Sequence, residues 1–183
     1  MLIKEAKKIT ESLTRTSKMP GLSYSLPAWA CQTGAKLRKI PTSPCFGCYA
    51  MKNNYIRYPA IKAAQYRRLD AITHPQWVEA MVAQIKRQKW FRWHDAGDLQ
   101  SSEHMQKIIE VCKLTPDTKH WLPTQERQYL PKPEDVPENL IIRLSAAKVD
   151  GTAGNAWSHS STVVTDGSPS CMAPTQGGKC LDC

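Results

Sequence analysis

Six of the seven cysteines form two similar clusters, one in each half of the chain. The first cluster comprises Cys31, Cys45 and Cys48, and the second comprises Cys171, Cys180 and Cys183. The two-residue gap in each Cys-x-x-Cys pair lets both thiolates turn toward one ion, and two such pairs complete a tetrahedral ligand set. The sequence therefore predicts a metal or iron–sulfur centre at which segments 31–48 and 171–183 form one site.

The spacing of the pairs favours an iron–sulfur cluster, with [4Fe-4S] as the first choice, over zinc. The two pairs of a zinc ribbon are separated by about 12–20 residues, whereas 131 residues lie between Cys48 and Cys180. Six cysteines also exceed the four that a structural zinc ion needs. Zinc remains the alternative. The first-choice ligands are drawn from Cys45, Cys48, Cys180 and Cys183, with Cys31 and Cys171 as alternates, and the spacing does not decide among the six. Cys112 lies in an apolar helical pattern and is predicted to be a core residue.

A second group of candidate residues follows the aromatic segment 90–94, which we expect to be a strand. The candidate catalytic residues are His94, Asp98 and Gln125, and the candidate cofactor-binding residues are Arg92, Asp95 and Gly97. Polar residues at the carboxyl ends of strands face the ligand crevice of α/β folds. His94 is a candidate acid, base or metal ligand, and Asp98 is placed to orient it or to bind a polar substrate. In the alternative interpretation, the two aspartates only cap the turn and the next helix.

Strands and helices alternate through the middle of the chain. We expect helices over residues 1–18, 59–70, 75–88 and from Ser101 or Ser102 to Pro116, and strands over 22–26, 90–94, 120–122, 140–144 and 162–164. Gln125, Glu126 and Ser145 follow predicted strands, so three successive strand ends are expected to frame one pocket. This order predicts a largely parallel sheet with helices packed on it. We expect one α/β domain over residues 1–183, a small or incomplete α/β barrel with long loops, with an open sheet as the second choice.

The composition indicates a globular protein of a reducing compartment. Of the 183 residues 41% are hydrophobic and 22% are charged, which is enough for a core. No segment approaches the roughly 20 apolar residues of a membrane span, and the N-terminal residues lack the apolar region of a secretory signal. An odd number of cysteines argues against an extracellular disulfide framework. We therefore expect a cytoplasmic protein with no membrane partner.

Positive charge is concentrated in the first half of the chain. Residues 1–90 carry 16 of the 25 Lys and Arg residues but only 4 of the 16 Asp and Glu residues. Such an excess attracts nucleic acid or another polyanion. The same excess is typical of solvated helix faces, and no nucleic-acid motif accompanies it. Nucleic acid is therefore one candidate partner, beside a small-molecule substrate or a redox partner.

Several motifs together resemble one family of phage proteins. They are Lys18-Met19-Pro20-Gly21, Ser25-Leu26-Pro27-Ala28, the segment from Cys45 to Ala50, Gly97-Asp98 and the segment from Gly177 to Cys183. In combination the chain resembles the phage gene product eighty-eight family over nearly its whole length. The resemblance implies a phage-encoded protein of the host cytoplasm, with an iron–sulfur cluster on a small α/β-barrel-like scaffold. It implies no particular activity.

Three functions follow as hypotheses. The first is an iron–sulfur protein whose cluster serves electron transfer, redox sensing or cluster-dependent chemistry. The second is a metal-dependent enzyme, of the radical S-adenosylmethionine kind or another, with its pocket at the strand ends. Thirteen residues separate Cys31 from Cys45, so the Cys-x-x-x-Cys-x-x-Cys pattern of the radical enzymes is not met. The third is a zinc-stabilised module that binds nucleic acid through the basic first half.

Overall fold

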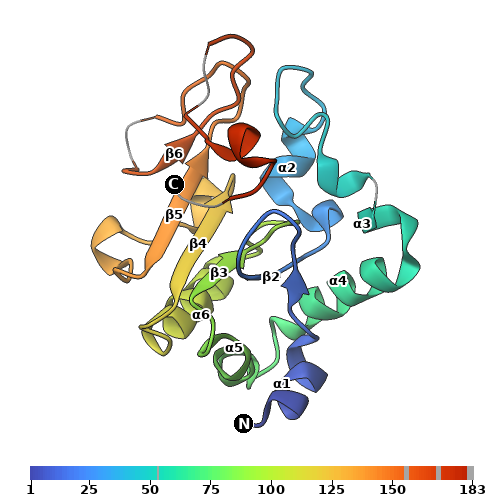
Figure 1. The fold of residues 1–183 in the computed structure, drawn as a ribbon, viewed down its shortest axis with the longest axis vertical. Coiled ribbons are helices and arrows are strands. Elements are labelled where there is room, and N and C mark those ends of the chain that lie inside the picture. The colour runs from blue at the N-terminus through green and yellow to red at the C-terminus, as the bar shows by residue number, and fades with distance from the viewer. Residues whose placement is uncertain (53, 155–156, 168–169, 181–183) are drawn as a thin grey trace.

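A mixed six-stranded sheet forms the centre of the molecule (Figure 1). The computed structural model describes residues 1–52, 54–154, 157–167 and 170–180. The strands, in chain order and in spatial order, are β1 (Thr14–Arg15), β2 (Leu22–Tyr24), β3 (Trp90–Trp93), β4 (Lys119–Thr124), β5 (Leu140–Ser145) and β6 (Ser160–Ser161). β1 is antiparallel to β2, and every later pair is parallel. The carboxyl ends of β2 to β6 therefore meet at one edge of the sheet.

α5 (Trp77–Ile85) and α6 (Ser102–Lys113) pack against one face of this sheet. The other helices are α1 (Ile3–Thr10), α2 (Gln32–Leu37), α3 (Asn54–Arg57) and α4 (Pro59–Ala71). Short 3-10 turns lie at η1 (Ala28–Ala30), η2 (Tyr49–Met51), η3 (Arg127–Tyr129), η4 (Pro133–Asp135) and η5 (Ala173–Gln176). Among the described residues, no helix is both long and apolar enough to cross a membrane.

The core lies between α5, α6 and the helix-covered face of the sheet. Phe91 and Trp93 of β3 are buried there against Trp77 of α5 and Met105 of α6. Strand side chains alternate between faces, so Arg92 lies on the opposite side. Val78, Met81 and Ile85 of α5 and Ile108, Ile109 and Cys112 of α6 are all buried in this core, which confirms the prediction that Cys112 is a core residue.

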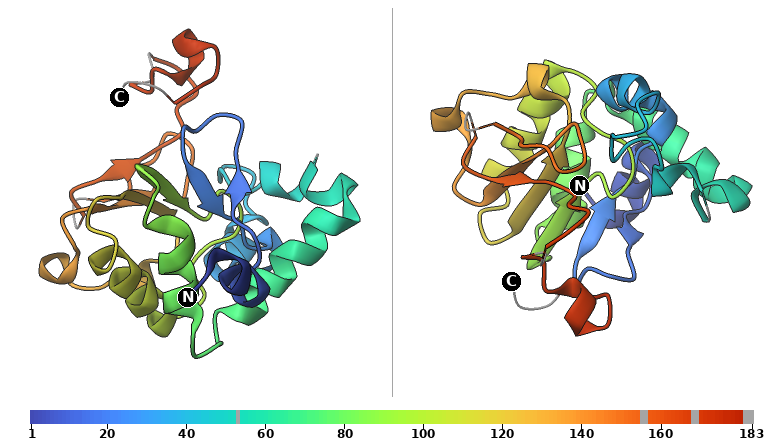
Figure 2. Two further views of the ribbon diagram at one scale, coloured as in Figure 1. Left: turned by 60° about the horizontal axis from the view of Figure 1, so that its bottom comes forward. Right: turned by 90° about the horizontal axis from the view of Figure 1, so that it is seen from above.

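The opposite face of the sheet, called the helix-free face below, carries no α-helix of the described chain. One row of register partners crosses it, namely Ser23, Arg92, Trp121 and Ile141. Both views of Figure 2 place η5 on this side, away from α5 and α6. The backbone N–H of Cys180 donates to the carbonyl of Lys18 at 2.7 Å, which ties the C-terminal segment to the chain just before β2.

The predicted α/β class is confirmed, and the differences have local causes. The helix expected over residues 1–18 ends at Thr10, because Glu11 adopts φ 62°, and the chain then forms β1. The last strand lies at Ser160–Ser161 instead of residues 162–164. No pairing among the described residues joins β6 back to β1, so these strands form an open sheet. The barrel-like character expected first is not confirmed.

Candidate functional site

The first cysteine cluster lies beyond the carboxyl edge of the parallel strands. The chain leaves β2 and immediately builds η1, α2 and the turn-rich segment 40–48, in which Cys48 N–H donates to the Cys45 carbonyl at 3.3 Å. Asp98 follows β3, and Gln125 and Glu126 follow β4. Ligand sites of parallel α/β folds form at this edge.

Gly34 shows how close two of these cysteines come. A Cβ atom built on Gly34 would lie 3.7 Å from the sulfur of Cys31 and 3.9 Å from the sulfur of Cys45. It would also lie 2.9 Å from the Cys31 Cβ, which is closer than a real side chain tolerates. Residue 34 must therefore be small for α2 to pack here. Two thiols that are 14 residues apart in sequence border the same point.

The electrostatic surroundings keep these thiols protonated. Burial raises the pKa of Cys31, and the charges of Asp98, Cys48, Glu126 and Cys45 raise it further. Burial also raises the pKa of Cys45, with a contribution from Cys48, while Ser43 and Arg38 oppose the rise. Deprotonation of these thiols would place several negative charges in one half-buried region, where they repel one another. A bound cation would offset this repulsion.

Glu126 fastens the Cys31 segment to the sheet. Its side chain is fully buried, and one carboxylate oxygen accepts from the backbone N–H groups of Gln32 at 2.9 Å and Thr33 at 2.8 Å. The other oxygen accepts from the Thr33 hydroxyl at 2.6 Å and the Gln128 amide at 2.7 Å. This carboxylate caps the first turn of α2, directly after Cys31. Sequence patterns place Glu126 only at a strand end, because its partners on α2 lie 93 and 94 residues away along the chain.

Asp98 connects the ends of β3 and β4. One oxygen accepts from Leu99 N–H at 2.8 Å and the Thr124 hydroxyl at 2.6 Å, and the other accepts from Gln125 N–H at 2.9 Å. Burial raises the pKa of Asp98 to about 6, and these hydrogen bonds oppose the rise. The Gln125 side chain donates to the Ala146 carbonyl after β5, so it is also engaged with the scaffold. The structure thus brings two of the three predicted catalytic residues together, in positioning contacts.

Asp95 joins β2 to the cysteine loop. Its carboxylate accepts hydrogen bonds from the hydroxyls of Ser23, Ser25 and Tyr55, and its carbonyl accepts one from the Tyr49 hydroxyl. Tyr49 follows Cys48 directly. Asp95 therefore orients the segment that carries the Cys-x-x-Cys pair.

His94, the third predicted catalytic residue, lies in the aromatic core instead. It adopts φ 55° and is buried, with its ring 5.3 Å from that of His104 on α6. Neither ring nitrogen of His94 has a hydrogen-bond partner in the described part of the chain. Burial lowers its pKa, so the ring is neutral. His104 is buried beside Trp77, and His120 is buried beside Trp93. No sequence motif marks either histidine as a candidate site residue.

Cys171 and Cys180 of the second cysteine cluster lie in the segment around η5, over the helix-free face. Both views of Figure 2 show η5 apart from α2, the helix that follows Cys31. Cys183 lies outside the described residues. Within residues 1–52, 54–154, 157–167 and 170–180, no three His, Cys, Asp or Glu side chains are arranged to hold a metal ion. The single site joining both clusters therefore stays a prediction.

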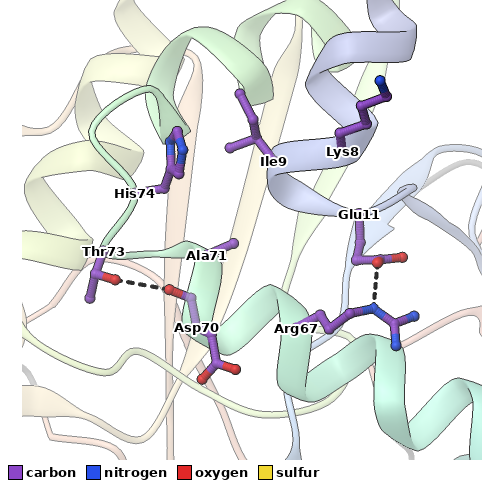
Figure 3. Close-up of a pocket in the computed structure, with 8 residues that line it drawn as sticks. All are labelled: Lys8, Ile9, Glu11, Arg67, Asp70, Ala71, Thr73 and His74. Carbon is purple, nitrogen blue, oxygen red and sulfur yellow. Dashed lines mark hydrogen bonds and ion pairs between the residues drawn. The ribbon is translucent and has the colours of Figure 1, made fainter.

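A hollow between α1 and α4 lies away from the cysteines (Figure 3). It is lined by Lys8, Ile9, Glu11, Arg67, Asp70, Ala71, Thr73 and His74. Arg67 and Glu11 form an ion pair across it, and the site faces open solvent. Figure 1 places α1 at the opposite end of the molecule from α2. No residue of this hollow belongs to the predicted site.

A model of the family described as Gene product 88 matches residues 1–171. The chain belongs to this family. The resemblance that the sequence motifs indicated is thereby confirmed. No curated protein and no solved structure matches the chain. The match to the Gene product 88 family includes Cys31, Cys45 and Cys48 and ends at Cys171, so Cys180 and Cys183 lie beyond it.

Proposed function

We propose that this Gene product 88 protein binds an iron–sulfur cluster, [4Fe-4S] as the first choice, at the carboxyl edge of its parallel sheet. Cys31, Cys45 and Cys48 are the proposed ligands, and the cluster would serve redox or electron-transfer chemistry in the host cytoplasm. The observation that carries the proposal is the convergence of thiols around Gly34, where two sulfurs border one point. Thiolates are the ligands that iron–sulfur clusters prefer.

The donor set fits such a cluster better than it fits a small hard cation. The nearby carboxylates, those of Asp98 and Glu126, already accept hydrogen bonds at both oxygens. They are therefore less available than the thiols, which bind soft metals. In this arrangement the carboxylates fix the loop, and the cysteines supply the ligands.

Metal analysis of anaerobically purified protein tests this proposal. We expect brown protein with broad absorption around 400 nm, matching amounts of iron and sulfide, and a paramagnetic resonance signal after reduction. Replacing Cys31, Cys45 or Cys48 with Ser should remove most of the iron. Cys112→Ser is the matched control, because that thiol is buried in the core between α6 and the sheet. Colourless protein that contains stoichiometric zinc would reject the iron–sulfur proposal and support a zinc site instead.

A cluster-dependent enzyme is the second candidate. The favouring observation is that the three N-terminal cysteines lie in the connection that follows the first parallel strand, at the edge where α/β enzymes bind substrates. Three thiolates would leave one coordination position open to a small molecule. Adding S-adenosylmethionine to the reduced, iron-loaded protein should then change its paramagnetic resonance spectrum. An unchanged spectrum would reject S-adenosylmethionine binding and leave electron transfer as the proposed role of the cluster.

A further inference from the structure

Arg92 lies at the centre of the helix-free face of the sheet. Its register partners are Ser23 on β2 and Trp121 on β4. The guanidinium carbon lies 4.7 Å from the centre of the Trp121 ring, a stacked cation–π contact. One terminal nitrogen contacts the sulfur of Met19 at 3.7 Å. A thioether is a weak acceptor on a flexible side chain, so this contact is easily displaced.

Two donors on this face lack an acceptor. The Nε of Arg92 and the indole Nε1 of Trp121 are both buried, and neither has a partner in the described part of the chain. Arginine and tryptophan side chains can only donate, so what they need is an acceptor. The one ion pair among the described residues joins Arg67 to Glu11, so Arg92 makes no ion pair with the described carboxylates. A half-buried guanidinium without a counter-ion is costly, and an oxyanion matches its planar fork.

The site also borders the first cysteine cluster. Tyr49, the residue after Cys48, is 55% exposed, but its hydroxyl turns inward and donates to the Asp95 carbonyl. Burial raises the pKa of Tyr49 and the nearby Arg92 opposes that rise, so the guanidinium lies close to this hydroxyl. The sheet face that carries Arg92 is therefore continuous with the loop that carries the Cys-x-x-Cys pair.

We propose that Arg92 and Trp121 form a binding site for a small oxyanion, a carboxylate or a phosphate group, which enters by displacing the Met19 thioether. The guanidinium supplies charge and paired N–H donors, and the indole N–H supplies one further donor. The site does not depend on the identity of the centre at the cysteines. A ligand held here would have its anionic group beside Tyr49 and could extend toward Cys48.

Titration calorimetry with inorganic phosphate and, separately, with acetate tests the site at constant ionic strength set with chloride. We expect saturable binding of at least one of the two anions, and the stronger binder identifies the group. Arg92→Gln should weaken that binding about tenfold or more, since a charged hydrogen-bonding group is lost. Trp121→Phe keeps the ring but removes the N–H, and should weaken binding by about threefold to tenfold. Arg92→Lys keeps the charge without the fork and should fall between wild type and Arg92→Gln.

Arg143→Gln is the matched control. Arg143 lies on the same sheet face, and its guanidinium already donates to the Ser160 carbonyl at 3.0 Å. Its loss removes the same charge and should leave the affinity unchanged within about twofold. Circular dichroism verifies that each variant folds. If Arg92→Gln does not fold, the affinities of Arg92→Lys and Trp121→Phe still decide the test. Absence of binding in wild type, or equal weakening in Arg143→Gln and the Arg92 variants, would overturn the proposal.

Discussion

Single carboxylates hold the cysteine loop in place, and Glu126 does so most directly. It accepts four hydrogen bonds, two of them from the backbone immediately after Cys31. A buried carboxylate in this role fixes the direction in which the preceding residue enters the helix. The geometry of Cys31, which follows β2, therefore depends on a residue that follows β4.

Glu126→Ala should free the Cys31 segment without unfolding the protein. The N–H groups of Gln32 and Thr33, whose bonds to Glu126 are partly buried, would lose their acceptor. The cost of each loss should lie at or below the lower end of the about 1–3 kcal/mol that a fully buried group costs. We expect metal-free protein to alkylate several-fold faster at Cys31, measured by mass spectrometry against Cys45 as internal reference. Glu126→Gln keeps acceptor capacity and should restore part of the protection. Glu134→Ala, at an exposed carboxylate on η4, should change neither rate.

The buried histidines predict a loss of stability in mild acid. Burial lowers the pKa of His104 to about 3 and that of His120 to about 4, and it lowers the pKa of His94 too. The unfolded chain then binds more protons than the folded one between pH 6.5 and pH 4, so stability falls as pH falls through this window. Asp98 acts in the opposite sense, because its pKa is raised to about 6. Three histidines outweigh one aspartate.

Urea unfolding at pH 7.0 and pH 5.5 measures this effect. The free energy of unfolding falls by about 1.4 kcal/mol per pH unit for each proton that the unfolded chain binds in excess of the folded chain. Lys107 adds to the effect at His104 and Arg92 adds to it at His94, since both are positive. His104→Phe keeps a ring against Trp77 and removes one titrating group, so the loss between the two pH values should shrink. An equal loss in the variant would contradict the assignment.

At the scale of elements, the turn between β3 and α6 is fixed by its contact with the end of β2. Leu26 N–H donates to the Ala96 carbonyl at 2.8 Å, and Gly97 adopts φ 79° against Leu26. A Cβ on Gly97 would lie 2.5 Å from the Leu26 Cβ. Gly97 therefore permits both the backbone conformation and the close approach that place Asp98 between the strands.

Gly97→Ala should destabilise the fold more than Gly154→Ala. Gly154 has nearly the same conformation, φ 81°, but no atom of the described residues lies within 4 Å of its Cβ position. The control thus contains only the backbone cost, about 1 kcal/mol, while Gly97→Ala adds overpacking of about 1–3 kcal/mol. Denaturant midpoints of both variants give the comparison. Similar midpoints would mean that the contact with Leu26 relaxes freely.

Most of the core elements could be predicted because their patterns are local. The apolar spacing of α5 and α6 and the alternation of β5 depend on neighbours in the sequence, and Ser101 caps α6 by bonding His104 N–H as its position suggests. The site was less predictable. Whether the polar residues after β3 face a ligand or the scaffold depends on partners far along the chain, as with Asp98 and Gln125. His94 lies in the core because its backbone is left-handed and its ring packs near that of His104. No sequence pattern relates these two residues, so this position could not be predicted.

At the scale of the whole molecule, the family match includes every strand of the sheet and ends ten residues after the last one. The match ends at residue 171, and the segment that follows lies over the helix-free face instead of extending the sheet. The folded core and the proposed N-terminal ligands both precede this point. The C-terminal segment contacts the rest of the described chain through the Lys18 carbonyl.

With the proposed N-terminal ligands, a chain ending at residue 171 should therefore fold and bind as much iron as the 183-residue chain. We expect its thermal midpoint to lie within a few degrees of that of the 183-residue chain, because little apolar surface is lost. Iron quantification and thermal unfolding are the two measurements. Loss of iron on truncation, restored by a chain that ends at Cys183, would show that the second cysteine cluster supplies ligands after all.

The lengths of the outer strands affect how the protein behaves at high concentration. β1 and β6, at the two margins of the sheet, are only two residues long, while β4 and β5 in the interior have six. A neighbouring chain that approaches either margin finds few unpaired amide groups to continue the ladder. The short outer strands thus discourage strand-to-strand aggregation at high protein concentration.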